Sequence, residues 1–288
     1  MKIRKAVFTA AGLGTRLLPA TKAQPKEMLP LVDKPIIQYV VEEAVASGIE
    51  QIIIVTGRGK RAIEDHFDVA FELEYYLNKK NDTESLHEVR KISDLANTVT
   101  YIRQKEPLGI GHAILVTREI VGDEPFAVLF PDDLIDAPIP CLKQMVQVYE
   151  RYNASVLAVQ RVERSAVSRY GIIAPKRVEE RVYQALDLVE KPKVEDAPSN
   201  LGIVGRYILT PEIFECLERT QPGAGGEIQI TDGLRLLAQM QPIYGYEFQG
   251  TRYDTGNKLG FLKASVEMAL KRPDLGAEFR AYLKTLDL

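Results

Sequence analysis

AVFTAAGLGTRLLPATKAQPKEMLPL, residues 6–31, contains most of the first apolar run of this chain and the turn that follows it. Its apolar start predicts a buried strand over residues 5–11, which runs into a small turn containing Gly12 and Gly14. Arg16 and Lys26 follow in a segment too rich in proline for a plain helix. A strand, a flexible turn and two cations in succession raise the question of which anion they bind.

Strands and helices alternate after this stretch. Apolar runs predict strands over residues 51–57, 99–104 and 126–133, and helical patterns fill residues 34–48, 61–77 and 111–122. The first of these helices opens at Pro35 and closes at Gly48. Continuous apolar strands separated by helices predict a parallel sheet with helices on both faces.

The second half of the chain has a less regular pattern. Strands are predicted over residues 154–162, 170–175, 182–192 and 202–210, some of them antiparallel, and helices over residues 231–240 and 256–272. The polar residues 78–97 are expected to form a mobile excursion. The pattern therefore predicts one α/β domain with a mixed sheet and a helical C-terminal tail.

Composition and charge bound the possible functions. The 288 residues are 45% hydrophobic and 27% charged, which is ordinary for a globular protein, and 37 basic against 40 acidic residues give a net charge of −3. Without a global basic field, nucleic acid is not an expected partner. We expect no membrane span and no signal peptide. Cys141 and Cys216 lack metal-site spacing, so we expect reduced thiols and a cytoplasmic protein.

The opening turn is similar to two phosphate-binding loops without matching either. The Gly-x-Gly of residues 12–14 begins like a dinucleotide fingerprint, but Leu17 stands where the third glycine belongs, and no Gly-Lys-Ser/Thr ending follows. Small residues at positions 10–12 let backbone N–H groups approach a ligand closely, and Arg16 and Lys26 add charge that suits a triphosphate. The alternative is that both cations are solvated surface residues.

A pair of carboxylates follows the strand predicted before residue 132. In open α/β sheets, ligands bind outside the carboxyl ends of the strands, so Asp132 and the opening turn should reach the same edge. A carboxylate there can hold Mg²⁺, which prefers oxygen ligands and bound phosphates. The alternative for Asp132-Asp133 is an ordinary acidic turn.

Two further carboxylates stand near strand ends. Glu190 and Lys191, in VEKP, offer a hydrogen-bond acceptor for sugar hydroxyls and a cation for a second phosphate. The alternative for them is a solvated surface pair. Asp254, in RYDTG, precedes a predicted helix, and its alternative role is to cap that helix.

No arrangement for nucleophilic catalysis is evident. The histidines are His66, His87 and His112, and neither a serine elbow nor a nucleophile–base pair accompanies them. Transfer of a nucleotidyl group onto a phosphate needs neither, because the attacking oxygen is already anionic at pH 7. Such an enzyme must align two polyanions and neutralise their repulsion.

With these features together, nearly the whole chain resembles the bacterial glucose-1-phosphate uridylyltransferases, or UDP-glucose pyrophosphorylases, of the sugar nucleotidyltransferase superfamily. The opening motif alone is typical of the superfamily, and PKEMLP, FELE and GIGHA narrow the resemblance to the uridylyltransferases. The other motifs that carry it are IIIVTGRGK, HFDVAFELE, QKEPLGIGHA, FPDD, VEKP, GGEIQITD and RYDTGNKLGFLKA.

The resemblance implies a role for each matching residue. Arg16 and Lys26 would hold the triphosphate and the leaving pyrophosphate, and Lys191 the sugar phosphate. Asp132 would be a Mg²⁺ ligand, with Asp254 as a possible second. The implied nucleotide contacts are Ala10, Ala11, Gly12, Gly14, Thr15, Glu27, Gln104 and Gly109, and the implied sugar contacts are Gly171, Glu190 and Glu227.

The resemblance also implies the overall plan. It predicts a Rossmann-like αβα sandwich with a mixed, mostly parallel central sheet in a single domain, residues 1–288. Residues 1–135 would form the nucleotide half, 136–260 the sugar half and 261–288 the helical tail. The implied partners are UTP, glucose 1-phosphate, UDP-glucose and pyrophosphate, with Mg²⁺ as cofactor, and the implied assembly is a homodimer or homotetramer.

Three alternatives stay open at this point. One is a sister enzyme that uses dTTP or CTP. Another is a regulatory paralogue that binds nucleotide sugar without turnover, although the presence of Arg16, Lys26, Asp132 and Lys191 argues against it. The third is a Rossmann dehydrogenase, which the missing third glycine disfavours.

Overall fold

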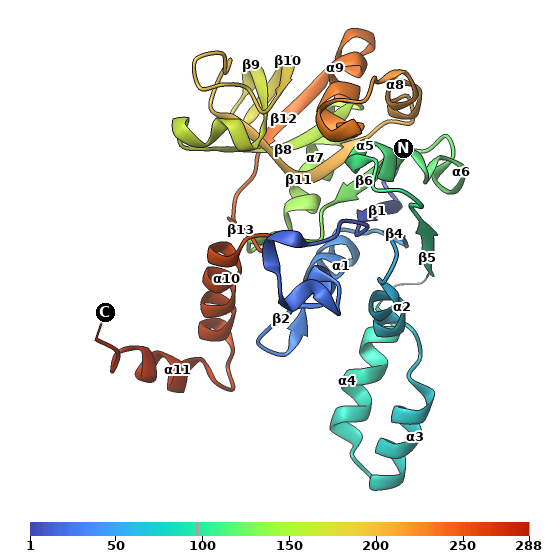
Figure 1. The fold of residues 1–288 in the computed structure, drawn as a ribbon, viewed down its shortest axis with the longest axis vertical. Coiled ribbons are helices and arrows are strands. Elements are labelled where there is room, and N and C mark those ends of the chain that lie inside the picture. The colour runs from blue at the N-terminus through green and yellow to red at the C-terminus, as the bar shows by residue number, and fades with distance from the viewer. Residues whose placement is uncertain (96–97, 288) are drawn as a thin grey trace.

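The computed structural model describes residues 1–95 and 98–287 (Figure 1). In the described residues one sheet has the strand order β5 (Thr98–Arg103), β4 (Gln51–Thr56), β1 (Lys5–Thr9), β6 (Phe126–Leu129), β11 (Leu201–Leu209), β8 (Ser155–Arg161), β12 (Ile243–Glu247), β10 (Val182–Glu190) and β9 (Gly171–Glu179). The strands β5, β4, β1 and β6 run parallel to one another, whereas β11 is antiparallel to β6 and β8. The predicted mixed sheet is confirmed: β5, β4, β1 and β6 form a parallel block, and β12 and β8 pair in parallel among the antiparallel strands that follow.

Helices cover both faces of the sheet. In β1, Ala6 and Phe8 belong to the core on one face and Val7 to the core on the other, and all three are fully buried. Truncation of Phe8 to alanine would therefore cost about 3–5 kcal/mol of folding free energy. The helices on the Phe8 face are α1 (Ile36–Ala46), α2 (Arg61–Phe67) and α7 (Cys141–Tyr152); those on the Val7 face are α5 (Gly109–Leu115), α6 (Arg118–Val121), α8 (Ile213–Arg219) and α9 (Ile230–Met240).

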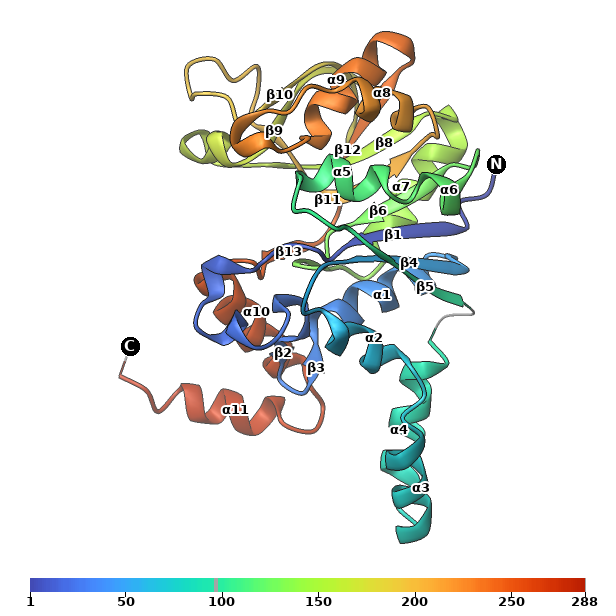
Figure 2. The same ribbon diagram turned by 45° about the vertical axis from the view of Figure 1, so that its right-hand side comes forward.

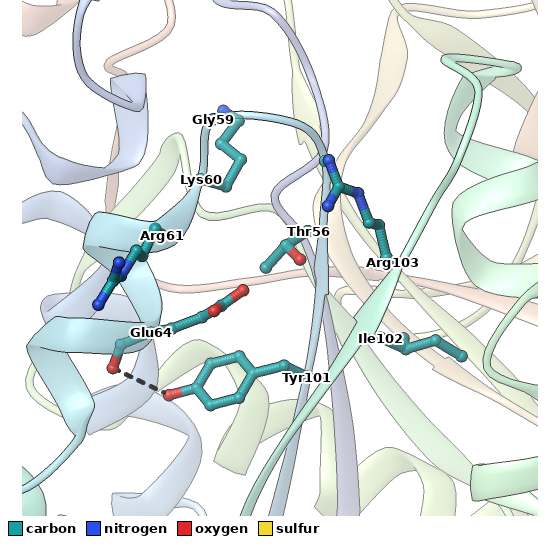
Figure 3. A pocket seen from close by; sticks show the side chains of 9 residues that line it. Thr56, Gly59, Lys60, Arg61, Glu64, Tyr101, Ile102 and Arg103 are labelled. Atoms are coloured by element: carbon teal, nitrogen blue, oxygen red, sulfur yellow. Dashed lines mark hydrogen bonds between the residues drawn. The ribbon is translucent and has the colours of Figure 1, made fainter.

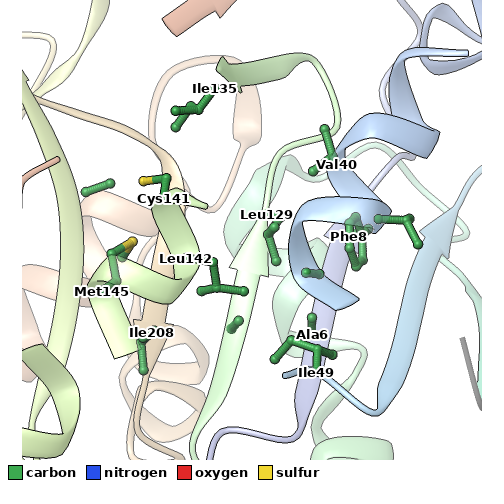
Figure 4. Close-up of a cluster of buried hydrophobic side chains, with 14 of the residues drawn as sticks. Ala6, Phe8, Val40, Ile49, Leu129, Ile135, Cys141, Leu142, Met145 and Ile208 are labelled. Carbon is green, nitrogen blue, oxygen red and sulfur yellow. The ribbon is translucent and has the colours of Figure 1, made fainter. Parts of the chain in front are cut away.

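The core on the Phe8 face joins the two halves of the chain. Val40 of α1 and Met145 of α7 lie in one cluster with Phe8, Leu129 of β6 and Ile208 of β11 (Figure 4). Because β6 and β11 are neighbours in the sheet, this cluster crosses from the parallel to the antiparallel part. The αβα sandwich is thus confirmed, and this core cluster is shared by the two halves of the chain.

The single helix predicted over residues 61–77 is wrong. The chain forms α2 and then α3 (Phe71–Lys80), and Asp68, with an extended ψ of 163°, ends α2. A further helix, α4 (Thr83–Ser93), begins where the Asp82 side chain accepts a hydrogen bond from Ser85 N at 3.1 Å. The α3–α4 pair projects away from the sheet (Figure 2), so the excursion expected at residues 78–97 is helical up to residue 93. Residues 96 and 97 lie outside the described part.

A two-stranded sheet brings together residues that lie far apart in the sequence. The strand predicted over residues 126–133 ends early, at Leu129, and β7 (Asp133–Asp136) begins a separate element. It pairs antiparallel with β13 (Thr251–Asp254), so that Asp254 lies opposite Asp133. This pairing places Asp254 beside the turn after β6.

The helical C-terminal tail is confirmed as α10 (Lys258–Lys271) and α11 (Gly276–Leu283). Ala264 of α10 is buried against Leu17, Leu31 and Ile36, so the tail packs on the opening stretch of the chain. A short hairpin, β2 (Pro30–Leu31) and β3 (Lys34–Pro35), lies in that stretch. Across the described residues, none of the helices is long and apolar enough to cross a membrane.

Candidate active site

The opening turn lies at the carboxyl end of β1, beside the carboxyl ends of its parallel neighbours β4 and β6. Gly14 has a φ of 69°, and a Cβ there would lie 3.2 Å from both Lys26 Cβ and Thr21 Cγ2. Thr21 Oγ1 donates to the Gly14 carbonyl at 2.8 Å. Glycine at this position therefore lets the turn fold back onto Lys26.

The backbone groups expected to contact a nucleotide differ in availability. Ala10 N donates to Val55 O at 2.9 Å, so this N–H group belongs to the sheet. A Cβ on Gly12 would meet nothing within 4 Å. Ala11 packs against the loop after β4, where a Cβ on Gly57 would lie 2.9 Å from Ala11 O, and Thr15 opens a short 3-10 helix, Thr15–Leu17.

Lys26 and Asp132 form the central ion pair of this site. Lys26 Nζ donates to Asp132 Oδ2 at 2.5 Å, and Arg16 Nη2 lies 4.0 Å from the same oxygen. Burial opposes ionisation of Asp132, but the charge and hydrogen bond of Lys26, with Arg16, hold the pKa of this carboxyl below its usual value. Burial likewise opposes the charge on Lys26, yet Asp132 and Glu27 raise the pKa of its ammonium. Both groups are therefore charged at neutral pH.

A second carboxylate converges on Asp132. Thr255 donates to the Asp132 carbonyl through its backbone N at 2.9 Å and its Oγ1 at 2.7 Å, and Gly256 N donates to Asp254 Oδ1 at 3.0 Å. A Cβ on Gly256 would lie 2.6 Å from Asp132 Oδ2 and 3.1 Å from Asp254 Oδ1. The alternative role of Asp254 as a helix cap is wrong, because Asn257 caps α10.

The two carboxylates fit a divalent cation such as Mg²⁺. Oxygens of Asp132 and Asp254 approach the same point beside Gly256, and the absence of a side chain there lets them converge. Mg²⁺ is usually bound through one or two carboxylates together with substrate phosphates. Arg16 and Lys26 lie beside the same point, and they would meet those phosphates.

Lys60 is a buried cation that sequence reasoning did not identify. Its Nζ donates to Glu27 Oε2 at 2.7 Å, and the two side chains are 6% and 0% exposed. Among the described residues, Glu27 Oε1 has no hydrogen-bond partner. Burial raises the pKa of Glu27, and the charges of Lys60 and Lys26 oppose that rise. A lysine placed just after the end of a parallel strand, in VTGRGK, was the available signal.

A cavity of about 330 Å³ opens beside Lys60, between the ends of β4 and β5 and the start of α2 (Figure 3). One wall of the cavity is basic and consists of Lys60, Arg61 and Arg103. Another wall contains Tyr101, whose Oη donates to Glu64 O at 3.5 Å. None of the predicted site residues lines this cavity. Its lining residues are Thr56, Gly57, Gly59, Lys60, Arg61, Glu64, Tyr101, Ile102 and Arg103.

The Gln104 amide is held by its neighbours. Its Nε2 donates to the Gly109 carbonyl at 3.0 Å and lies 3.0 Å from His112 Nδ1, while its backbone N donates to Thr56 O at 2.9 Å. The NH₂ group is thus engaged, and no donor among the described residues reaches Oε1. The group left for a ligand is an acceptor, which matches the N3–H of uracil or thymine.

Glu227 lies next to the nucleotide side rather than among the other expected sugar contacts. Gly109 has a φ of 91°, and a Cβ there would lie 2.8 Å from Glu227 Cβ and 2.8 Å from Ile228 O. Only glycine lets these two segments approach so closely. The Glu227 side chain is exposed and accepts from Gln229 Nε2 at 3.0 Å.

The other expected sugar contacts gather at the ends of β9 and β10. Gly171 and Glu190 are cross-strand partners, and Glu190 Oε2 accepts from Thr231 Oγ1 at 2.6 Å. A Cβ on Gly171 would lie 2.7 Å from the same Oγ1, so glycine allows this contact. Lys191 follows with a φ of 44° and pairs with Glu190 Oε1 at 2.8 Å. Sequence reasoning missed Thr231, although it lies in the quoted GGEIQITD.

The structure therefore brings the expected residues together in three groups. Arg16, Lys26, Asp132 and Asp254 gather beside Gly256; Gln104, Gly109 and Glu227 form the second group; Gly171, Glu190 and Lys191 form the third.

Known proteins are similar to this chain over almost its whole length. A family model described as nucleotidyl transferase matches residues 5–270. A UTP–glucose-1-phosphate uridylyltransferase of Staphylococcus epidermidis is 54% identical over 287 residues, which cover 100% of this chain and 99% of the relative. One of Bacillus subtilis is also 54% identical, over 99% of this chain and 97% of the relative.

Solved structures are similar along almost the whole chain. A UDP-glucose pyrophosphorylase complexed with UDP-glucose has 49% identity and a TM-score of 0.86, and the match covers 94% of this chain and 100% of that one. A UTP-bound UGPase from Acinetobacter baumannii has 42% identity and a TM-score of 0.93, with 99% and 100% covered.

Proposed function

The chain belongs to the nucleotidyl transferase family, and we propose that it transfers the uridylyl group of UTP to α-D-glucose 1-phosphate, giving UDP-glucose and pyrophosphate. The convergence of Arg16, Lys26, Asp132 and Asp254 beside the opening turn carries this proposal. Relatives at 54% identity named as uridylyltransferases, and neighbours solved with UDP-glucose and with UTP, support the choice of substrates. The family assignment excludes the alternative of a dehydrogenase.

The reaction requires that two polyanions meet. A phosphate oxygen of glucose 1-phosphate attacks the α-phosphorus of UTP; one P–O bond forms, the bond to the bridging oxygen breaks, and pyrophosphate leaves. The attacking oxygen is anionic at pH 7, so the protein supplies no nucleophile. Arg16 and Lys26 neutralise the triphosphate and the leaving pyrophosphate. One phosphoanhydride replaces another, which makes the reaction reversible.

Mg²⁺ would be held by Asp132 and Asp254, and it would neutralise phosphate charge. Lys26 orients Asp132 by donating to its Oδ2 at 2.5 Å, and Thr255 fixes the Asp132 backbone through two hydrogen bonds. The carboxylate is thereby preorganised for its ligand.

The two halves of the chain divide the substrates. Residues 1–135 take the nucleotide, with Gln104 reading the base edge, and residues 136–260 take the sugar. Lys191 binds the sugar phosphate, and Glu190, Gly171 and Glu227 contact the sugar. The clustering of Gly171, Glu190 and Lys191 at the ends of β9 and β10 supports this division, whereas Glu227 would reach the sugar from beside Gly109.

The proposal includes the localisation and the assembly of the enzyme. Cys141 and Cys216 are buried free thiols, which suits a cytoplasmic protein. We expect a homodimer or homotetramer, and light scattering after size-exclusion chromatography would give its size.

Pyrophosphate release with a panel of nucleoside triphosphates and sugar 1-phosphates tests the function. We expect turnover with UTP, glucose 1-phosphate and Mg²⁺, with UDP-glucose as the second product. Absence of UDP-glucose with every pair of substrates would refute the proposal.

A further inference from the structure

We propose that Arg252 and Tyr170 are positioning residues. They hold Lys191, the proposed contact of the sugar phosphate, at a fixed place relative to the sheet β7–β13, which carries Asp254. Contacts run from Asp133 through Arg252 and Tyr170 to Lys191. The inference rests on the proposed function, because it takes Lys191 as the contact of glucose 1-phosphate and Asp254 as a metal ligand.

The first link is a buried ion pair within β7–β13. Asp133 Oδ1 accepts from Arg252 Nε at 2.7 Å and lies 2.5 Å from Nη2, while Asp133 Oδ2 accepts from Gly205 N at 2.7 Å. The side chains of Arg252 and Asp133 are 11% and 7% exposed. Both nitrogens approach the same carboxylate oxygen, so this buried, charge-assisted contact holds the guanidinium against Asp133. Arg252 precedes Asp254 by two residues in β13, so the fixed strand also carries the metal carboxylate.

The second link joins this strand to the sugar side. Arg252 Nη1 donates to the Tyr170 hydroxyl at 3.1 Å, and the guanidinium carbon lies 5.5 Å from the centroid of the Tyr170 ring. The Tyr170 carbonyl accepts from Lys191 N at 3.0 Å. Tyr170 packs closely on β11, where a Cβ on Gly202 would lie 3.2 Å from Tyr170 Cβ and Cγ. Tyr170 thus contacts Arg252 through its side chain and Lys191 through its backbone, and its packing on β11 holds the two contacts together.

The backbone of Lys191 makes this support necessary. Its φ of 44° lies in the left-handed region, which residues other than glycine rarely adopt. Such a conformation persists only where surrounding groups hold it, and it often marks a functional site. The backbone bond to Tyr170 is the contact that ties this exposed turn to the rest of the site.

Tyr170→Phe tests the link, because it removes the hydroxyl and keeps the ring. The matched control is Tyr183→Phe: the Tyr183 hydroxyl also accepts from an arginine, Arg161 Nη2, at 3.0 Å and donates to Glu247 Oε2 at 3.0 Å. Tyr183 lies in the same strand as Glu190, near its opposite end. The measurements are the KM values of both substrates and the Kd values of UDP-glucose and UDP.

We expect Tyr170→Phe to raise the KM for glucose 1-phosphate and the Kd of UDP-glucose roughly tenfold, because a hydrogen bond to a charged group is lost. For Tyr170→Phe the KM for UTP and the Kd of UDP should keep their wild-type values, because Asp133 still holds Arg252 and with it the strand that carries Asp254. Arg252→Lys should act in the same direction, and the double variant should be no worse than the poorer single one. Tyr183→Phe should match wild type.

Two results would overturn the inference: equal changes in both KM values, or Tyr170→Phe and Arg252→Lys variants that both match wild type. Arg252→Lys keeps the test open if Tyr170→Phe does not fold. Failure of the proposed function looks different, because then the wild-type protein itself makes no UDP-glucose, and the inference falls with it. If the wild type is active and the variants keep its ratio of UDP affinity to UDP-glucose affinity, only the positioning role is refuted.

Discussion

Lys26 and Asp132 stand 106 residues apart in the chain and meet with 2.5 Å between Nζ and Oδ2. The pair connects the opening stretch to the turn after β6, so the cation proposed to bind phosphates and the carboxylate proposed to bind the metal are held at one point. Alignment of charged groups before reaction is the main way in which a phosphoryl-transfer site lowers its barrier. The pair is therefore the first place to test the site.

Asp132→Asn should leave the fold intact and abolish most turnover. Loss of one preorganised electrostatic contact typically lowers the rate by about 10²–10³-fold, and loss of the metal adds to that. Steady-state kinetics across a Mg²⁺ titration measure the effect, with the exposed Asp196→Asn as control. A folded Asp132→Asn variant with near-normal kcat at saturating Mg²⁺ would exclude Asp132 as the ligand.

Lys191→Ala should raise the KM for glucose 1-phosphate and lower kcat, because a cation that positions the second anion is lost. The KM for UTP should change much less. Lys193→Ala, which removes an exposed cation two residues away, is the matched control. A shift in the KM for UTP instead would place Lys191 in the nucleotide half.

Lys60→Met should destabilise the protein by about 3–5 kcal/mol at pH 7, since it leaves the Glu27 carboxylate buried without its cation. A carboxyl whose pKa is raised in the folded state takes up a proton on folding, so this deficit should shrink as the pH falls toward about 4. Urea titrations across that range measure it, and Glu27→Gln/Lys60→Met should recover part of the loss. A deficit independent of pH would show that Glu27 is not the cause.

Base choice should follow the order UTP, then dTTP, then CTP in kcat/KM. Gln104 presents an acceptor, Oε1, because Gly109 and His112 engage its NH₂ group. Uracil and thymine offer N3–H to it, whereas cytosine has an unprotonated N3 there and leaves buried polar groups unpaired. The thymine methyl group costs about 1–3 kcal/mol in a close-fitting pocket. Equal use of CTP and UTP would refute this reading, and Gln104→Ala should reduce the discrimination.

The sequence alone predicted those features of the fold that depend on a local pattern of residues. Continuous apolar runs identified β1, β4 and β11, because strands buried on both faces cannot be polar. Asp132 could be placed at the sheet edge because it directly follows such a run. Breaks were harder: α2 and α3 share one helical pattern, and their separation at residues 68–70 is not marked by glycine or proline.

Contacts between distant segments could not be predicted. The pairing of β7 with β13, which brings Asp254 to Asp132, depends on the register of two four-residue strands. The burial of Glu27 with Lys60 depends on how the loop after β4 packs against the opening stretch. Neither is a property of sequence spacing: only the family resemblance suggested that Asp132 and Asp254 act together, and the buried pair of Glu27 and Lys60 needed coordinates.

Glycine would be required at positions 256 and 12 for different reasons: folding would require it at 256, and substrate binding at 12. At position 256 the protein itself excludes a side chain, since a Cβ would lie 2.6 Å from Asp132 Oδ2, whereas nothing lies within 4 Å of a Cβ at position 12. A mutant library sorted for folding alone would tolerate alanine at position 12 and disfavour it at position 256. A library sorted for turnover would reject it at both, and the positions at which the two libraries disagree would outline the volume that the substrate fills.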